Sequence, residues 1–215
     1  MAVAARIDQT KLDVFRWRYE LSISKKLALA LGVAIFVGLL AQVRFPLPWS
    51  PIPITGQTFA VLLVGVLLGR WWGGISLAIY AGLGIAGVPL FSGWTSGLGA
   101  TGGYIIGFIF ATLFLGYLTD KYIRSRSFLC MFGLMLFANF VLIYIPGLLW
   151  LGLWLGMVKG STATLSSLFM MGAIPFIAGD ITKAALAAAI TRGVTPKSAY
   201  NGEVDKDKWA KWRLP

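Results

Sequence analysis

The sequence predicts an all-α integral membrane protein with six transmembrane helices. Of its 215 residues, 58% are hydrophobic and only 13% are charged, whereas an ordinary soluble domain has about 25% charged residues. Long segments such as 128–154 contain no charged residue, and about 20 apolar residues are enough to cross a bilayer. At this length, we expect one compact helical unit in the membrane.

Six apolar segments carry this prediction, between a polar segment at residues 1–23 and a polar tail at residues 193–215. The predicted spans are 24–43, 55–69, 72–88, 102–119, 128–146 and 174–192.

The short second and third spans require a tight turn, which we place at residues 70–74 (RWWGG). The fifth span is followed by more apolar residues up to Val158, too many for one upright helix. Pro146 removes a backbone donor, so we expect the helix to break there and the rest to lie near one membrane surface. Pro175 is near the start of the last span, a favourable position for proline.

Basic residues predict the orientation. Six of the 19 Lys and Arg residues lie in the first 26 positions, and six more lie from Arg192 onward. The loops on the opposite side contribute only Arg44 and Lys159. Because basic loops stay in the cytoplasm, we expect a multi-pass protein of the cell membrane with both termini cytoplasmic. The net charge of +11 then reflects orientation and attraction to anionic lipid.

Several classes of chemistry lack their usual residues. The sequence has no histidine, which removes the commonest general base and metal ligand. Its single cysteine, Cys130, lies in an apolar span, and no phosphate-binding Walker loop occurs. The glycines of residues 82–87 (GLGIAG) match a dinucleotide fingerprint in letters only, since they end a predicted membrane helix rather than follow a strand. We therefore expect no catalytic residue, no metal and no cofactor.

An acid and a base stand inside the last apolar span. Asp180 and Lys183 are three residues apart, so they share one face of a helix, and ionisable residues in a membrane are costly enough to suggest a function. In the predicted topology both lie in the outward half of the membrane. They form either an ion pair that fixes helix packing or the polar floor of a ligand site.

The predicted outer loops favour the ligand site. The loop at 87–103 is uncharged and rich in glycine, which lets backbone approach a ligand. Trp94 and Tyr104 offer flat apolar surfaces with polar edges. Gln57 and Asn139 are uncharged polar groups at membrane depth, and each either contacts the ligand or bonds to a neighbouring helix.

Five segments, in order and spacing, resemble the BioY family, the biotin-specific S components of energy-coupling factor (ECF) vitamin transporters. They are PIPITGQTFAVLLVGVLLG, LAIYAGLGIAGVPLF, TGGYIIGF, IYIPG and PFIAGDITKAALAA. The resemblance covers about residues 24–192 and implies an S-component-like six-helix bundle that binds biotin. It departs from the family at Ala100, where proline is common, and at Trp94, where small residues are usual.

The same resemblance implies roles for individual residues. Asp180 and Lys183 match the family element that contacts the ligand, and Ala30 and Ala34 match the small residues that contact a transmembrane coupling protein. A pair of cytoplasmic ATPases would supply the hydrolysis that this chain lacks. We thus expect a high-affinity biotin-binding subunit that captures biotin outside and releases it inside. The alternatives are an S component for another vitamin, an intramembrane enzyme and a purely structural membrane protein.

Overall fold

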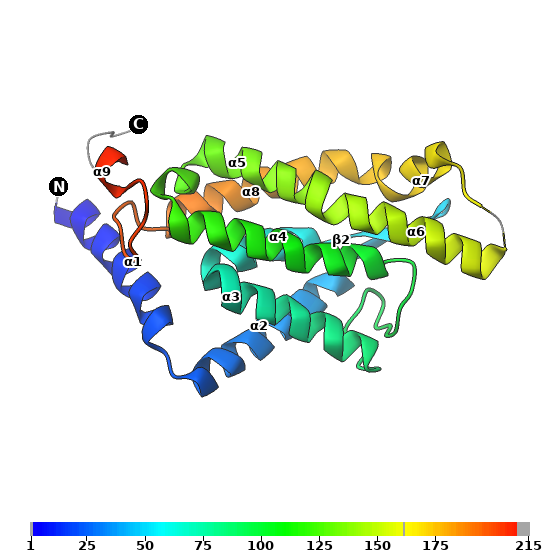
Figure 1. The fold of residues 1–215 in the computed structure, drawn as a ribbon, viewed down its shortest axis with the longest axis horizontal. Coiled ribbons are helices and arrows are strands. Elements are labelled where there is room, and N and C mark those ends of the chain that lie inside the picture. The colour runs from blue at the N-terminus through cyan, green and yellow to red at the C-terminus, as the bar shows by residue number, and fades with distance from the viewer. Residues whose placement is uncertain (1, 161, 210–215) are drawn as a thin grey trace.

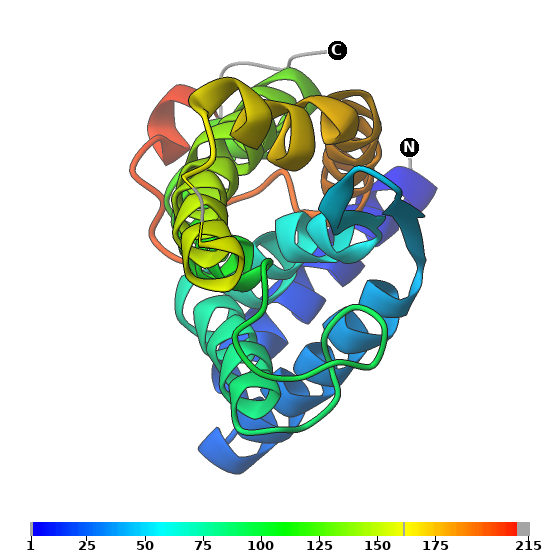
Figure 2. The same ribbon diagram turned by 90° about the vertical axis from the view of Figure 1, so that its right-hand side faces the viewer.

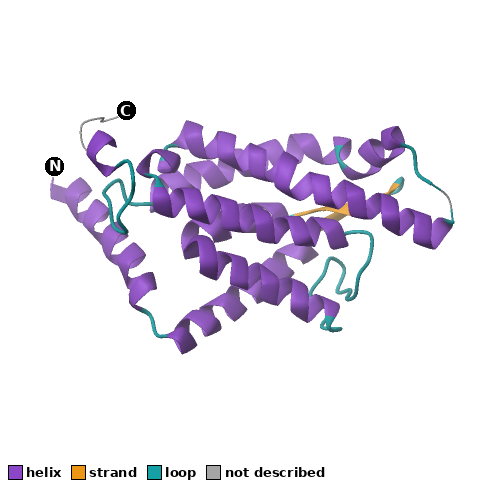
Figure 3. Ribbon diagram, in the orientation of Figure 1, coloured by secondary structure: helices purple, strands orange, loops and turns teal. Residues whose placement is uncertain are grey.

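The computed structural model describes residues 2–160 and 162–209. Helices make up most of this part, and most of their axes follow the long axis of the molecule (Figures 1 and 3). Both ends of the chain lie at the same end of that axis (Figure 1). The elements are α1 (Ala2–Glu20), α2 (Ile23–Gln42), β1 (Arg44–Leu47), β2 (Ser50–Thr55), α3 (Gln57–Ile85), α4 (Gly102–Lys121), η1 (Ile123–Arg126), α5 (Phe128–Phe137), η2 (Ala138–Ile143), α6 (Tyr144–Lys159), α7 (Leu165–Gly172), η3 (Ile174–Phe176), α8 (Ile177–Val194) and α9 (Lys206–Trp209).

Five helical segments of the described chain are long and apolar enough to cross a membrane. They are Ile23–Gln42, Gln57–Ile85, Gly102–Lys121, Phe128–Val158 and Leu165–Val194. The segment Gln57–Ile85, which is α3, folds back on itself and passes twice. The all-α membrane fold with six passes is therefore confirmed.

The reversal of α3 occurs at Gly69, whose φ of 78° and ψ of 179° leave the helical region. The Gln57 amide Nε2 donates to the Tyr80 hydroxyl at 2.6 Å, although in a straight helix these residues would be roughly 34 Å apart. The turn was predicted at residues 70–74, and this position is wrong, because these residues are helical and the reversal is at Gly69.

Glycine at the turn has a steric reason as well as a conformational one. A Cβ at Gly69 would lie 2.6 Å from Oδ2 of Asp120. That oxygen accepts a hydrogen bond of 3.1 Å from the Arg70 N–H. The turn is thus fixed against the last turn of α4, which the sequence pattern alone does not reveal.

The predicted break at Pro146 is wrong, because α6 continues through this proline to Lys159. A π-helix, η2, precedes it, and such local widening re-satisfies the carbonyls that a proline leaves free. The continuous rod formed by α5, η2 and α6 runs past the end of α4 (Figure 1). Gly103 permits this packing, since a Cβ there would lie 2.1 Å from the Pro146 carbonyl oxygen.

An antiparallel hairpin replaces the loop expected between the first two spans. Arg44 pairs with Thr55 and Phe45 with Ile54, with an irregularity before the pair Leu47 and Ser50. Proline tolerates an edge position in a sheet, and here both strands are edges. Figure 2 shows the hairpin and the 86–101 loop at the end of the molecule opposite the chain termini.

Helix α2 packs against α3, and several of its small residues are buried. Ala30 and Ala34, predicted to contact a coupling protein, are both 0% exposed, so neither is accessible to a partner in this structure. Gly38 continues the stripe, and a Cβ there would meet Leu90 at 3.1 Å. These small residues are thus covered by other parts of this chain, and their contact with a coupling protein stays a prediction.

The two terminal segments pack together. Phe15 of α1 is 4% exposed, and its ring lies 5.5 Å from that of Tyr200 in the tail. Asp205 accepts hydrogen bonds from the Ile123 and Arg124 N–H groups at the start of η1. Residues 193–209 are thus part of the folded body, and residues 210–215 of the predicted tail lie outside the described residues.

Candidate functional site

Asp180 and Lys183 lie on the first turns of α8, as their spacing predicts. The short helix η3 places Pro175 just before α8 begins at Ile177. The Lys183 ammonium contacts the Asp180 carboxylate at 2.9 Å. The pair faces the bundle, because the Asp180 side chain is only 4% exposed and that of Lys183 20%.

The Asp180 carboxylate is saturated by donors from three further elements. Oδ1 accepts from the Thr58 hydroxyl of α3 at 3.1 Å, in addition to Lys183. Oδ2 accepts from Asn139 Nδ2 of η2 at 2.9 Å and from the Tyr144 hydroxyl of α6 at 2.7 Å. A carboxylate has about four acceptor positions, so every one is occupied by the protein.

Lys183 connects the same cluster to the hairpin. Its ammonium donates to the Thr55 carbonyl at 2.7 Å and to the Thr58 hydroxyl at 3.1 Å, as well as to Asp180. Its three donors are therefore all used. Unlike Asp180, however, Lys183 keeps a part of its side chain exposed. An acceptor on a ligand can therefore replace one of the acceptors that the ammonium now contacts.

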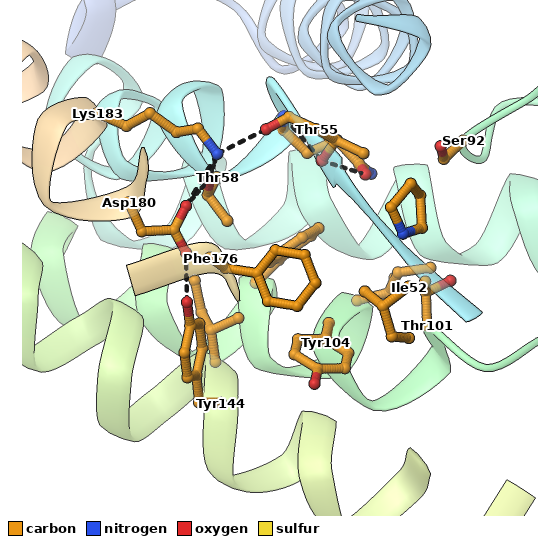
Figure 4. A pocket seen from close by; sticks show the side chains of 15 residues that line it. Ile52, Thr55, Thr58, Ser92, Thr101, Tyr104, Tyr144, Phe176, Asp180 and Lys183 are labelled. Atoms are coloured by element: carbon orange, nitrogen blue, oxygen red, sulfur yellow. Dashed lines mark hydrogen bonds and ion pairs between the residues drawn. The ribbon is translucent and has the colours of Figure 1, made fainter. Parts of the chain in front are cut away.

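A pocket opens directly beside this cluster (Figure 4). Asp180, Lys183, Thr55 and Thr58 form one side of it in Figure 4, Phe176 lies in the middle, and Ser92 and Thr101 lie toward the other side. Its volume is about 50 Å³. The lining residues are Ile52, Pro53, Thr55, Gln57, Thr58, Ser92, Thr101, Tyr104, Ile105, Phe108, Ile143, Tyr144, Phe176, Asp180 and Lys183.

The pocket walls between the two polar sides are apolar and aromatic. Tyr104 lines the pocket with its ring and donates from its hydroxyl to the Gly172 carbonyl at 2.7 Å. Its ring packs edge-on against Tyr144, with centroids 6.3 Å apart. A site of this shape suits a flat, partly apolar ligand with polar groups at its ends.

The other sequence-predicted residues divide into two groups. Gln57 lines the pocket, but its amide is engaged by Tyr80 and by the Thr55 hydroxyl. Asn139 is 0% exposed and lies behind Asp180, outside the lining, with its Oδ1 lacking a hydrogen-bond partner. Trp94 is 59% exposed and does not line the pocket.

Trp94 points away because the loop around it is held by its backbone. Gln42 Oε1 accepts from the Gly93 and Trp94 N–H groups at 3.0 and 3.1 Å. Its Nε2 donates to the Phe91 carbonyl at 3.1 Å. The loop therefore presents Ser92, and not Trp94, to the pocket.

Sequence reasoning missed Thr58 and Tyr144, which hold the Asp180 carboxylate. Each was visible as a polar group near a predicted span end, but threonine and tyrosine are common there. A carboxylate in a span requires several hydrogen-bond donors. Asp180 itself was therefore the signal that such donors lie nearby. Which helices would supply them depends on the packing.

The cluster holds its charges by hydrogen bonds and an ion pair, an arrangement suited to binding. Asp180 and Lys183 neutralise each other, and the surrounding hydroxyl and amide groups act as donors to the acid. Among the described residues, no group of three or more His, Cys, Asp or Glu side chains could hold a metal ion.

Known proteins place the chain in a family. Residues 9–200 match the model of the BioY family. The chain is 52% identical over 155 residues to a probable biotin transporter BioY of Methanothermobacter thermautotrophicus, covering 70% of this chain and 99% of that protein. It is 38% identical to a probable biotin transporter BioY of Pyrococcus horikoshii over 165 residues, or 74% of this chain and 90% of that protein.

A solved structure is similar as well. It is the crystal structure of the S-component for biotin from an ECF-type ABC transporter, with a TM-score of 0.68 and 26% identity. The match covers 81% of this chain and 94% of that one. With the family model matching most of its length, the chain belongs to the BioY family.

Proposed function

We propose that the protein is the biotin-binding S component of an ECF-type transporter and takes part in biotin uptake. The observation that carries this proposal is the pocket beside the Asp180–Lys183 pair, with its saturated acid and aromatic walls. The relatives named as biotin transporters and the similar biotin S-component support it. Biotin is then the transported ligand and not a cofactor.

The hydrogen bonds of the floor suggest how biotin is recognised. Because Asp180 already has four donors, a ligand N–H can reach it only by replacing one of them. Lys183 can instead exchange the Thr55 carbonyl for an acceptor on the ligand at little cost. A hydrogen bond to a charged group contributes about 1.5–3 kcal/mol.

The charge balance favours one biotin group over another as the partner of Lys183. The Asp180–Lys183 pair has no net charge, and a ligand carboxylate would add a second negative charge next to Asp180. The neutral carbonyl of the ureido ring adds none. We therefore place the ureido ring at the floor and the carboxylate toward Ser92 and Thr101, which lie on the other side of the pocket.

Binding requires the pocket to widen. A volume of about 50 Å³ holds only a few water molecules, and the bicyclic ring of biotin is larger. Phe176 and the loop that carries Ser92 border the space, so we expect them to move on binding.

The orientation and the partners follow from the same proposal. Both termini lie at one end of the bundle, and β2 and the start of α4, which line the pocket, lie toward the other (Figure 1). The basic terminal segments favour the cytoplasm for the first end. Biotin would enter from outside. The sequence has no Walker loop, so ATP hydrolysis belongs to a cytoplasmic ATPase pair, linked through a transmembrane coupling protein.

Calorimetric titration of the purified chain in detergent tests the proposal. We expect one-to-one binding of biotin, and no heat with thiamine or riboflavin. Binding of thiamine or riboflavin in place of biotin would make the chain an S component for another vitamin. The absence of binding by any of the three to folded protein would contradict the proposal and leave the enzyme and structural alternatives.

A further inference from the structure

A second, smaller pocket lies at the end of the bundle that holds the termini, where α1, α2 and the turn of α3 meet. It is lined by Arg18, Leu21, Lys26, Leu29, Leu67, Leu68 and Trp72. These residues combine two basic groups and an indole with four leucines. The pocket that we assign to biotin shares none of them.

The apolar wall of this pocket opens toward the membrane. Leu29 of α2 and Leu67 of α3 are each 40% exposed, although both belong to spans. Trp71, next to the pocket residue Trp72, is 64% exposed. A hydrocarbon chain of a lipid can therefore lie along this wall and continue into the pocket, whose volume of about 20 Å³ takes only part of it.

The polar wall carries positive charge that the protein does not neutralise. Arg18 is paired with Asp120, but Lys26 makes no ion pair with a carboxylate of the described residues. The Lys26 ammonium donates to the Tyr19 carbonyl at 2.8 Å. Two of its three donors remain for another acceptor.

The position of Lys26 in the first turn of α2 increases the need for an anion. The N-terminal end of a helix has unpaired N–H groups and a positive dipole, which disfavour cations and favour anions. The first turn of α2 contains no acidic residue, and Ser22 makes no side-chain capping hydrogen bond.

Trp72 completes a site for an interfacial headgroup. The Lys26 ammonium lies 6.0 Å from the centre of its ring, and an indole at this depth is typical of the membrane–water boundary. From these contacts we propose that the pocket binds one anionic phospholipid. Its phosphate would contact Lys26 and the N-terminal N–H groups of α2, and one acyl chain would lie along Leu29 and Leu67.

Lipid retention in native mass spectrometry tests the proposal, with the full chain released from nanodiscs of mixed phosphatidylglycerol and phosphatidylcholine with the same acyl chains. We expect one retained phosphatidylglycerol in preference to phosphatidylcholine. Lys26→Gln should lower this retention about fivefold, since one lysine near an anionic surface contributes about 1 kcal/mol. Lys26→Arg should restore it, because the charge remains.

Lys25→Gln is the matched control, because it removes the same charge from the adjacent exposed position without touching the pocket lining. Its retention should change less than twofold. Equal losses in Lys25→Gln and Lys26→Gln would show diffuse charge attraction and overturn the site, as would equal retention of the two lipids.

Soluble glycerol phosphate should bind far more weakly than the lipid. Equal binding of the two would show that the site takes a free phosphate and would overturn the lipid assignment. Biotin affinity should stay unchanged in all three variants. The lipid measurement itself does not depend on which ligand the other pocket binds.

Discussion

Two buried ion pairs, one toward each end of the bundle, have similar bonding and different surroundings. Asp180 and Lys183 are 4% and 20% exposed, and Arg126 and Glu203 are 3% and 0% exposed. Both acids are held by several donors. The difference is that Lys183 lines an aromatic pocket, whereas the Arg126 side chain is covered by protein on every side.

Arg126 is enclosed by the tail of the protein. Its guanidinium donates to the carbonyls of Thr119, Pro196 and Ser198 and to Glu203. The Tyr200 ring covers it, with its centre 4.4 Å from the guanidinium carbon. The Asp180–Lys183 pair thus lies where a ligand can reach it, whereas the Arg126–Glu203 pair ties chain segments together.

The largest expected effect comes from removing the enclosed base. Arg126→Met leaves the buried Glu203 carboxylate without its cation, and breaking a buried pair in this way costs about 3–5 kcal/mol. We expect the thermal unfolding midpoint in detergent to fall by roughly 10 °C. Lys197→Met, which removes an exposed lysine of the same tail, should change it by less than about 2 °C. Similar midpoints for the two variants would show that the tail does not stabilise the fold.

Removing the base at the pocket should act on binding. In Lys183→Met the floor loses the donor that we assign to the ureido carbonyl. Biotin affinity should fall by about 10- to 150-fold, which corresponds to one charge-assisted hydrogen bond. Calorimetric titration measures it, and Lys197→Met should bind biotin like the unmodified protein. An unchanged affinity in Lys183→Met would mean that this lysine is structural, like Arg126.

Tyr144→Phe should have a smaller effect on the same floor. It removes one of the four donors to Asp180, and a single hydrogen bond contributes about 1 kcal/mol, so we expect about fivefold weaker biotin binding. Tyr104→Phe is a close control, because its ring also lines the pocket but its hydroxyl bonds to the Gly172 carbonyl. A greater loss in Tyr104→Phe than in Tyr144→Phe would contradict the assignment of the floor to Asp180 and its donors.

The smallest effect is a dependence of stability on pH at the enclosed pair. Burial alone raises the pKa of Glu203, but hydrogen bonds from Arg126 and from the Tyr200 and Asn201 N–H groups more than offset this and hold the pKa below its ordinary value of 4.5. An acid with a lowered pKa stabilises the fold above its unfolded-state pKa, and this contribution is lost as the pH falls through the folded-state value.

The unfolding midpoint should therefore decrease below about pH 4.5 by a shift of about 2–4 °C that depends on Glu203. Glu203→Gln should lack this part of the decrease. Glu20→Gln, which changes an exposed glutamate of α1, should keep it. The same acid response in both variants would show that Glu203 is not the group that titrates.

The sequence indicated the charged pair beside the pocket because charges inside an apolar span are rare and costly. Asp180 and Lys183 could be found for that reason, and their spacing placed them on one helix face. Thr58 and Tyr144 could not, since their roles depend on how α3 and α6 pack against α8. Asn139 could be found as a polar group at membrane depth. Its position behind Asp180, however, also depends on how the helices pack.

The same limit applies to the fold. The six spans follow from apolar length alone. The continuous helix through Pro146 depends on the π-helix before it and on Gly103 in a different span. The burial of Ala30 and Ala34 depends on which neighbour faces α2, and a stripe of small residues predicts a close contact without naming the partner.

The most direct test of the central claim compares one acid from each end of the bundle. Asp180→Asn and Asp120→Asn each remove a carboxylate that holds a base, Lys183 in the pocket and Arg18 at the end that holds the termini. Biotin titration of folded protein should show at least about 30-fold weaker binding for Asp180→Asn, since it leaves a buried lysine without its partner, and less than twofold change for Asp120→Asn. Unchanged affinity in Asp180→Asn, or equal losses in both, would contradict the assignment of the biotin site.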